Sequence, residues 1–392
     1  MTELAAPSAV ARGPGAGAAP GALRRAAPAL LVYAGTRAMG LVVLAVWAAV
    51  ADRSAHQLLA ERWDSLWYAR IADGGYGHSV SMPDGSVHSD LAFFPMLPWL
   101  ERLLAALGPL SAADAGLLVS AVASLFAAWG LFAVGDRVAG PRAGVTLVTL
   151  WAVLPVGIVQ SMAYSESLFT ALAAWSLYAL LDRRWVLAGA LAALAGLTRP
   201  VGAAVVAAVW LTAGAELARD AGRRRRWWHE RAMLAGVALA PLGWAGYVAW
   251  VSVRTGSPAG YLDVQAGWGN GFDGGLAFAS FIVERLLSEA FPAGAALLAG
   301  VGVLLWLFAV AIRQRLPLPL LVYAGVVLTL ALTAKGYFGS KPRLLIPAFP
   351  LLLPVATALA GRRPARTALV LGSAALGSAV YGAFWLHGSG PP

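Results

Sequence analysis

Residues 112–135 read AADAGLLVSAVASLFAAWGLFAVG and carry a single charged side chain, that of Asp114. A helix needs about 17–25 mostly apolar residues to cross the hydrocarbon core of a bilayer, so this stretch is long enough to do so. Similar runs recur along the whole chain, and only 12% of its residues are charged. Soluble domains usually carry about 25% charged residues. The sequence therefore predicts an all-α polytopic membrane protein.

Eleven segments of this kind predict about eleven transmembrane helices. Residues 1–27 are rich in Ala, Gly and Pro and predict a disordered cytoplasmic tail, whereas residues 28–392 are expected to form a single transmembrane domain. Two neighbouring segments are divided only by the break Thr198-Arg199-Pro200. The expected spans are residues 28–51, 112–135, 143–162, 166–181, 185–198, 200–218, 232–253, 293–312, 316–334, 344–360 and 367–386.

The basic residues predict the orientation of these helices. With the N-terminus inside, 18 of the 29 Lys and Arg residues fall in the tail and the inner loops, as the positive-inside rule requires. An odd number of spans then places the C-terminus outside, together with two long outer segments at 52–111 and 254–292. The run 223–228 (RRRRWW) fits a topology anchor with interfacial tryptophans better than a nucleic-acid site. The abundance of Ala, Gly and Arg suggests a bacterial source, hence the plasma membrane.

The first outer segment holds seven acidic residues and opens with the stretch 62–72, RWDSLWYARIA. Trp63, Trp67 and Arg70 follow helical spacing, and Gly74 and Gly75 come after them. This pattern predicts a short amphipathic helix that lies at the membrane interface. Asp64 falls at its start, where unpaired amides favour a negative charge. The carboxylate is therefore either a helix-start residue only or a functional group.

Two further segments carry aromatic and acidic residues on the same predicted side. Residues 92–100 (AFFPMLPWL) predict a second interfacial helix whose beginning is restricted by prolines. Residues 163–169 (AYSESLF) place Glu166 between two hydrophobic spans. An ionisable group at membrane depth is costly and indicates a functional role, although Glu166 could also serve only to cap the helix that follows.

Several cations break the charge rule of the inner loops. Arg199 interrupts two apolar spans, and Lys341 and Arg343 lie in a short loop that is predicted to be outside. An anionic ligand would explain them, because Arg binds phosphate through a planar fork and Lys binds it as a point charge. Snorkelling of the long side chains to the outer interface is the alternative explanation.

Taken together, the segments 62–76, 92–98 and 163–169 resemble the PIG-V family of mannosyltransferases, which belongs to the GT-C superfamily of membrane glycosyltransferases. The resemblance covers residues 28 to about 200, and beyond them it rests on the hydropathy pattern and on Lys341-Pro342-Arg343. It implies a GT-C-like fold, with the amphipathic helices in the first outer loop. It also implies that mannose is transferred, with inversion, from a polyprenyl-phosphate-linked donor to an acceptor on the outer face.

The resemblance also implies roles for individual residues. Asp64 maps to the catalytic base of GT-C enzymes, and Glu166 is the candidate for a second catalytic carboxylate, since Ser65 stands where many relatives carry an adjacent acid. We expect substrate binding by a group of aromatic and cationic residues. Its members are Trp63, Trp67, Tyr164, Arg199, Lys341 and Arg343. Where this chain has Pro200, eukaryotic members have Asn, which weakens the comparison around Arg199.

The chemistry asks for little beyond these groups. Inverting transfer needs one base for the acceptor hydroxyl, and a lipid phosphate leaves as an anion beside fixed positive charge. The five histidines are scattered and there is no cysteine, so no metal site and no cofactor are expected, although a divalent ion held by carboxylates stays open. Expected partners are the lipid-linked donor, membrane lipids and a lipid, glycan or protein acceptor, but no nucleic acid. A transporter or flippase of lipid-linked sugars is the alternative from another class, and another GT-C activity, on protein or cell-wall glycan, is the alternative within the enzymes.

Overall fold

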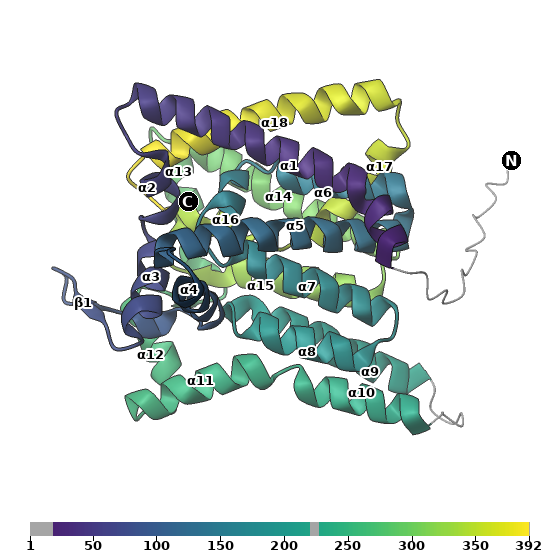
Figure 1. Cartoon of the computed structure of the whole chain (residues 1–392), viewed down its shortest axis with the longest axis horizontal. Coiled ribbons are helices and arrows are strands. Elements are labelled where there is room, and N and C mark those ends of the chain that lie inside the picture. The colour runs from purple at the N-terminus through teal and green to yellow at the C-terminus, as the bar shows by residue number, and fades with distance from the viewer. Residues whose placement is uncertain (1–18, 220–226, 392) are drawn as a thin grey trace, which may run out of the picture.

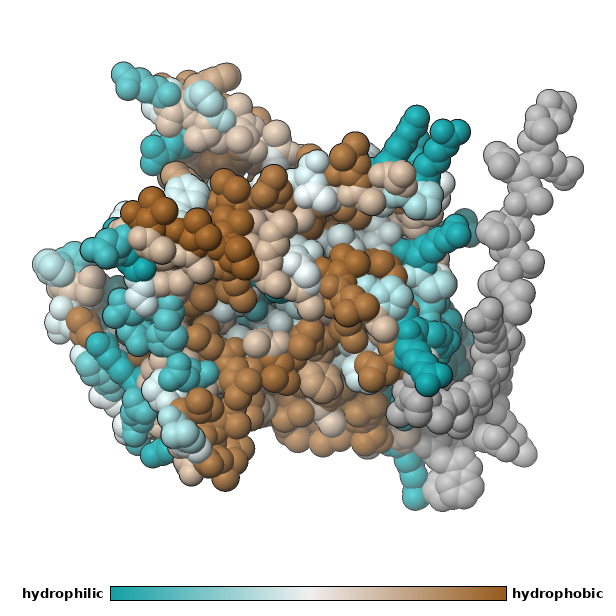
Figure 2. Space-filling model, turned by 45° about the horizontal axis from the view of Figure 1, so that its top comes forward, coloured by the Kyte–Doolittle hydropathy of each residue, from teal (hydrophilic) through white to brown (hydrophobic). Residues whose placement is uncertain are grey.

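The computed structural model describes residues 19–219 and 227–391 and is mostly helical. Its long helices lie side by side, and α2 (Ala55–Ala60), α3 (Asp64–Gly74) and α4 (Met96–Leu107) gather at one end of the bundle (Figure 1), which we call the loop end. Hydrophobic residues form a broad band on the face seen in Figure 2, and hydrophilic residues gather toward its two ends. This distribution is that of a multi-pass membrane protein.

Six segments of the described residues are long and apolar enough to cross a membrane by themselves. A seventh candidate is a pair of helices, Phe338–Leu344 and Phe349–Ala360, with a bend of 73° between them. The helices in these segments are α1 (Ala19–Val50), α5 (Ala112–Ala139), α9 (Ala203–Arg219), α10 (Trp227–Leu239), α11 (Leu242–Thr255), α14 (Phe291–Arg313), α16 (Lys341–Leu344), α17 (Leu353–Ala360) and α18 (Pro364–His387).

The prediction of about eleven spans is not confirmed, although a helix lies in each of the eleven expected segments. The remaining apolar helices are short: at about 1.5 Å per residue, the 12 residues of α8 extend about 18 Å, well below the roughly 30 Å of a hydrocarbon core. The expected break at Thr198-Arg199-Pro200 does separate α8 from α9. These shorter helices are α6 (Pro141–Ala152), α7 (Glu166–Leu181), α8 (Trp185–Gly196) and α15 (Leu318–Thr333).

The boundary of the predicted tail requires a correction. Helix α1 begins at Ala19, so residues 19–27, which were expected to be disordered, are helical. Ala, Leu and Arg are strong helix formers, and these nine residues continue directly into the helix of the apolar span that follows. The rest of the predicted tail, residues 1–18, and Arg223–Arg226 of the predicted topology anchor lie outside the described residues.

Close helix contacts in the core depend on small residues. A Cβ atom added to Gly189 of α8 would collide with the backbone of Gly236 in α10. Helices in a membrane gain little from the hydrophobic effect between them, so close van der Waals packing at small residues holds them together. This packing fixes the position of α8 against α10. Arg199 comes shortly after the end of α8.

The first long segment folds into compact elements at the loop end. The predicted short helix is α3, and it ends at Gly74 with Gly75 in a left-handed conformation (φ 76°). Its buried face is formed by Ser65, Tyr68 and Ile71, not by the predicted stripe of Trp63, Trp67 and Arg70, because α3 packs onto α4 and α5. A hairpin of β1 (Ser79–Ser81) and β2 (Val87–Ser89) follows, with Val80 opposite His88.

The second long segment lies against the first. It contains α12 (Gly260–Gly267), β3 (Gly271–Phe272) and α13 (Leu276–Leu286), and β3 pairs with β4 (Ala334–Lys335). The indole of Trp268 donates a hydrogen bond to the carbonyl of Ser89 (2.9 Å), and Arg53 donates to the carbonyl of His387 (3.1 Å). Both long segments and the end of α18 are therefore at the same end of the bundle.

We expect the loop end to face the outside. Because the chain has no cysteine, a single one at exposed Ser81 reports the side of the membrane without background. A membrane-impermeant maleimide should label Ser81→Cys on intact cells, and should label Arg313→Cys, at the opposite end of α14, only after permeabilisation. The reverse pattern would invert the orientation and remove the basis for an outer-face reaction.

Candidate active site

Asp64 is the first residue of α3, where the amides of the first helical turn have no intrahelical acceptor. The residue before it, Trp63, has φ 53° and ψ −122°. Residues other than glycine rarely adopt this backbone conformation, which costs about 1–3 kcal/mol. The guanidinium of Arg62 lies 3.9 Å from the centre of the Trp63 ring and donates to the carbonyl of Leu386 (2.6 Å). The strained turn that presents Asp64 is thus fixed to the C-terminal helix.

Glu166 is the first residue of α7 and is 1% exposed. The chain before it is irregular from Val153 onward and includes a 3₁₀ turn, Gly157–Ser161. The amide of Ala163 donates to the carbonyl of Leu59 (3.0 Å), so this irregular segment lies directly beside the chain that leads to Asp64. Two helix starts, of α3 and α7, are in this way brought together with an acid at each.

Arg343 belongs to α16 and is 279 positions from Asp64 along the chain. Its Nη1 lies 2.5 Å from Oδ2 of Asp64, and its Nε lies 3.4 Å from Oε1 of Glu166. The guanidinium also lies over the ring of Tyr164, at 5.1 Å from the ring centre. Since the side chain of Arg343 is only 9% exposed, a full positive charge is buried between two carboxylates.

Arg199 completes the group from the break between α8 and α9. Its Nη1 lies 2.5 Å from Oε1 of Glu166 and donates to Oγ of Ser165 at 3.1 Å. The break is fixed in place because the amide of Met96, at the start of α4, donates to the carbonyl of Leu197 (3.0 Å). Pro200 ends the helical pairing at this point, which frees Arg199 from the helix and lets it reach Glu166.

We call Asp64, Glu166, Arg199 and Arg343 the charge cluster. Its formal charges cancel, and each buried charge has an opposite partner, as burial requires. Glu166 lies between both guanidinium groups, yet neither of its oxygens accepts a well-aligned hydrogen bond. The side chain of Asp64 is 23% exposed, whereas that of Glu166 is 1% exposed. Of the two acids, Asp64 is therefore the one that a substrate can reach.

Tyr68 and Ser165 adjoin the charge cluster, and the sequence did not single them out for a role. Their hydroxyl oxygens lie 2.9 Å apart, and Ser165 also accepts from Arg199. Burial raises the pKa of Tyr68 well above its usual value, so its hydroxyl remains protonated. Tyr68 follows Asp64 by four residues, and residues four apart lie on the same side of a helix. This spacing is the sequence signal that could have identified Tyr68.

The other predicted binding residues lie in different surroundings. Trp67 stacks on Phe93 with ring centres 5.7 Å apart and meets the edge of Trp268. Lys341 points away from the charge cluster: its Nζ donates to the carbonyls of Ala331 (2.6 Å) and Ala334 (2.5 Å) at the end of α15. It also lies over the ring of Phe278 (4.6 Å). The structure thus groups Arg199 and Arg343 with the two acids and separates Lys341 from them.

The two carboxylates of this site pair with arginine side chains. Among the described residues no group of three or more His, Asp or Glu side chains could hold a metal ion. The space between Asp64 and Glu166 is filled by the guanidinium of Arg343. A charge-neutral cluster with one accessible carboxylate can remove a proton from a bound hydroxyl and can offer N–H groups to an anion.

The chain was compared with protein families, curated proteins and solved structures. Residues 88–250 match the profile of the dolichyl-phosphate-mannose-protein mannosyltransferase family, which is less than half of the chain. No curated protein matches the sequence.

Among solved structures, the chain is similar to ArnT from Cupriavidus metallidurans bound to undecaprenyl phosphate, with a TM-score of 0.54 at 15% identity. That match covers 91% of this chain and 64% of the ArnT chain, so the protein spans less than two thirds of the length of ArnT. The archaeal oligosaccharyltransferase AglB from Archaeoglobus fulgidus, in complex with an inhibitory peptide and a dolichol-phosphate, is more distant. Its TM-score is 0.48 at 12% identity, with 92% of this chain and 56% of that chain covered. At 15% identity, the likeness to ArnT is a likeness of fold alone.

Proposed function

We propose that the protein is an inverting glycosyltransferase that moves mannose from a polyprenyl-phosphate-mannose donor to an acceptor on the outer face of a bacterial plasma membrane. The observation that carries the proposal is the charge cluster, in which one accessible carboxylate and two buried guanidinium groups meet at the loop end. The family match over residues 88–250 supports a mannose donor. The fold shared with an undecaprenyl-phosphate-bound protein supports a lipid carrier.

In the proposed reaction Asp64 acts as the general base. The acceptor oxygen attacks the anomeric carbon of mannose, the bond from that carbon to the phosphate oxygen breaks, and Asp64 takes the acceptor proton. The electron pair of the broken bond leaves with the lipid phosphate, which departs as an anion without needing an acid. This role is supported by the partial exposure of Asp64 and by the contact of its carboxylate with Arg343 at 2.5 Å.

Arg343 and Arg199 are the proposed phosphate ligands. Arg343 directs Nη1 at Asp64 and Nε toward Glu166, which leaves the N–H groups of Nη2 for a phosphate oxygen. Glu166 is buried too deeply to meet the acceptor, and we assign it a positioning role, since its Oε1 lies within ion-pair distance of both guanidinium groups. Fixed positive charge of this kind stabilises the anion that develops on the leaving phosphate.

A protein hydroxyl is the second candidate for the acceptor, beside a lipid or glycan. It is favoured by the family match, because that family is named for transfer of mannose to protein. The chemistry at Asp64 is the same for either acceptor, since both supply an alcohol. Parallel assays with serine- and threonine-containing peptides and with a glycolipid acceptor separate the two.

The assay that tests the function uses purified protein reconstituted in lipid vesicles with labelled polyprenyl-phosphate-mannose. Transfer from this donor, but not from GDP-mannose, is the expected result. Transfer only from polyprenyl-phosphate-glucose would overturn the sugar assignment. If no lipid-linked sugar were consumed with any acceptor class, while the protein stayed folded, the assignment as a glycosyltransferase would be wrong.

We expect activity to be independent of divalent cations. The guanidinium of Arg343 stands between Asp64 and Glu166, where a metal ion held by both carboxylates would have to bind. Excess EDTA should therefore change the initial rate of transfer by less than about twofold. A loss of activity on chelation that added Mg²⁺ or Mn²⁺ restores would show that Arg343 moves aside for a metal in the working enzyme.

A further inference from the structure

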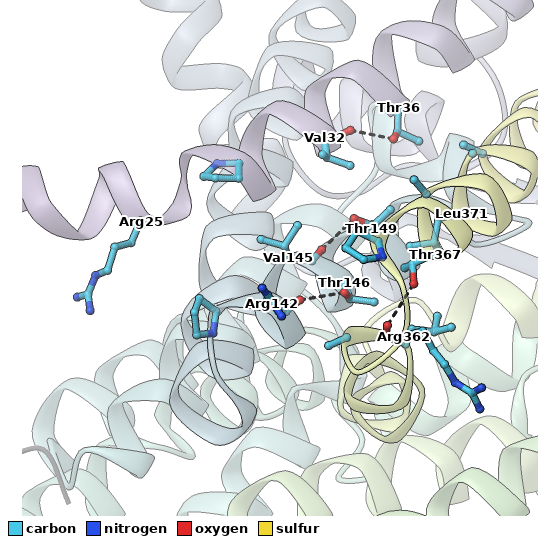
Figure 3. A pocket seen from close by; sticks show the side chains of 18 residues that line it. Arg25, Val32, Thr36, Arg142, Val145, Thr146, Thr149, Arg362, Thr367 and Leu371 are labelled. Carbon is cyan, nitrogen blue, oxygen red and sulfur yellow. Dashed lines mark hydrogen bonds between the residues drawn. The ribbon is translucent and has the colours of Figure 1, made fainter. Parts of the chain in front are cut away.

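An open cavity lies at the other end of the bundle, far from the charge cluster. It has a volume of about 570 Å³ and is lined by residues of α1, α6, α17 and α18 and of the segments that join them (Figure 3). Its walls are apolar, with Val32, Val145 and Leu371 among the lining residues. Four threonines also line it, but each hydroxyl donates a hydrogen bond to a backbone carbonyl of another lining residue. Thr36 donates to Val32, for example, and Thr149 donates to Val145. The interior therefore suits hydrocarbon.

The rim of the same cavity is positively charged. Arg25, Arg142 and Arg362 line it, and none of its 18 lining residues is acidic. Within the described part of the chain, none of the three side chains takes part in an ion pair. In Figure 3, Arg142 lies beside the cavity, and Arg25 and Arg362 extend outward on two sides of it.

Two helices add to this positive potential. Helices α6 and α18 begin at Pro141 and Pro364, both of which line the cavity. The first turn of each helix leaves N–H groups without intrahelical acceptors and carries the positive end of the helix dipole. An anion at the rim would meet these groups as well as the three arginines.

We propose that this cavity binds one anionic glycerophospholipid of the surrounding membrane, with its acyl chains in the apolar interior and its phosphate at the arginine rim. An apolar chamber beside unpaired arginines at the end of a transmembrane bundle matches a molecule that is apolar at one end and anionic at the other. Basic pockets between transmembrane helices recognise anionic head groups in this way. The site is separate from the one that would hold the sugar donor.

The N-terminal segment of the chain is a poorer match for the same cavity. Residues 1–18 contain one acid, Glu3, and one base, Arg12, and otherwise consist mainly of small apolar residues. Since the charges of Glu3 and Arg12 cancel, these residues offer no net negative charge to balance three arginines. A soluble nucleotide or sugar phosphate is equally unsuited, because the interior has no polar group free to receive it.

The test measures lipid binding to the purified protein by native mass spectrometry, with phosphatidylglycerol and phosphatidylcholine as probes. The triple variant Arg25→Gln, Arg142→Gln, Arg362→Gln should bind phosphatidylglycerol at least about tenfold more weakly, since each basic residue near a lipid surface contributes a factor of about five. A matched variant neutralises Arg184, Arg219 and Arg313, which are exposed and do not line the cavity. It carries the same charge change and should bind as the wild type does.

A second pair of variants tests the interior. Gly372 of α18 lines the cavity, and a Cβ there meets nothing within 4 Å, so Gly372→Leu introduces a side chain at the cavity wall. It should weaken phosphatidylglycerol binding by at least about fivefold, the factor expected when burial of one or two methylene groups is lost. Gly377→Leu, at an equally open position of the same helix outside the cavity, should not. Equal losses in both charge variants, no preference for phosphatidylglycerol over phosphatidylcholine, or unchanged binding by Gly372→Leu would each overturn the site.

Discussion

Replacing Asp64 by asparagine is expected to lower the rate of mannose transfer by about 10²–10⁴-fold, the usual contribution of a general base. The amide keeps the shape of the carboxylate but cannot take the acceptor proton. Donor binding should survive, because the charge cluster changes from neutral to a net charge of +1 and a phosphate is then attracted at least as strongly. The measurement is single-turnover transfer by reconstituted protein, with donor affinity determined separately.

Glu166→Gln is the matched control for this experiment. It changes the charge of the cluster by the same amount and is also isosteric, so a comparison of the two variants isolates basicity from charge. Because Glu166 is 1% exposed and positions the two arginines, its variant should retain more activity than Asp64→Asn. Near-normal turnover of Asp64→Asn together with an inactive Glu166→Gln would transfer the base role to Glu166.

Replacing Arg343 by alanine should have the second largest effect, on both donor binding and stability. The variant leaves Asp64 and Glu166 facing each other with one guanidinium fewer, and removal of one partner of a buried ion pair typically costs about 3–5 kcal/mol. Hydrogen bonds to a charged group contribute about 1.5–3 kcal/mol, so donor affinity should fall by about 10–150-fold. The measurements are thermal unfolding of the purified protein and donor binding at a temperature where the variant is folded.

Two further variants separate the two effects of Arg343. Combining Arg343→Ala with Glu166→Gln restores a neutral cluster, so it should recover part of the stability but none of the donor affinity. Lys341→Met removes a neighbouring cation that caps carbonyls at the end of α15, and it should lower stability while donor affinity stays the same. If Arg343→Ala bound the donor as well as the wild type, the phosphate would have to be held elsewhere, with Arg199 as the remaining candidate.

The hydrophobic pattern alone located the apolar segments in which the long helices lie, because the cost of burying a polar backbone in lipid is met locally, within each helix. Local signals also gave the start of α3 at Asp64 and its end at Gly74, and the break before Pro200. The number of full spans could not be obtained in this way. Whether a helix of 12 or 16 residues crosses the membrane depends on what surrounds it, and the pattern of its own residues is the same in either case.

Which residues meet was decided by the tertiary structure. Asp64 and Arg343 are 279 positions apart in the chain, and no local periodicity relates them. The sequence marked Lys341 and Arg343 as equivalent cations, but residues two positions apart on a helical turn point about 200° apart, so one caps a neighbouring helix and the other reaches the acids. The sequence by itself thus identified two acids and several cations that the charge rule for inner loops does not explain. It could do so because composition and predicted topology can be read segment by segment. Only the tertiary structure decided which of these charges pair and that Asp64 is the accessible carboxylate. The charges come from four separate segments, and these segments must pack against one another before the charges are buried away from water.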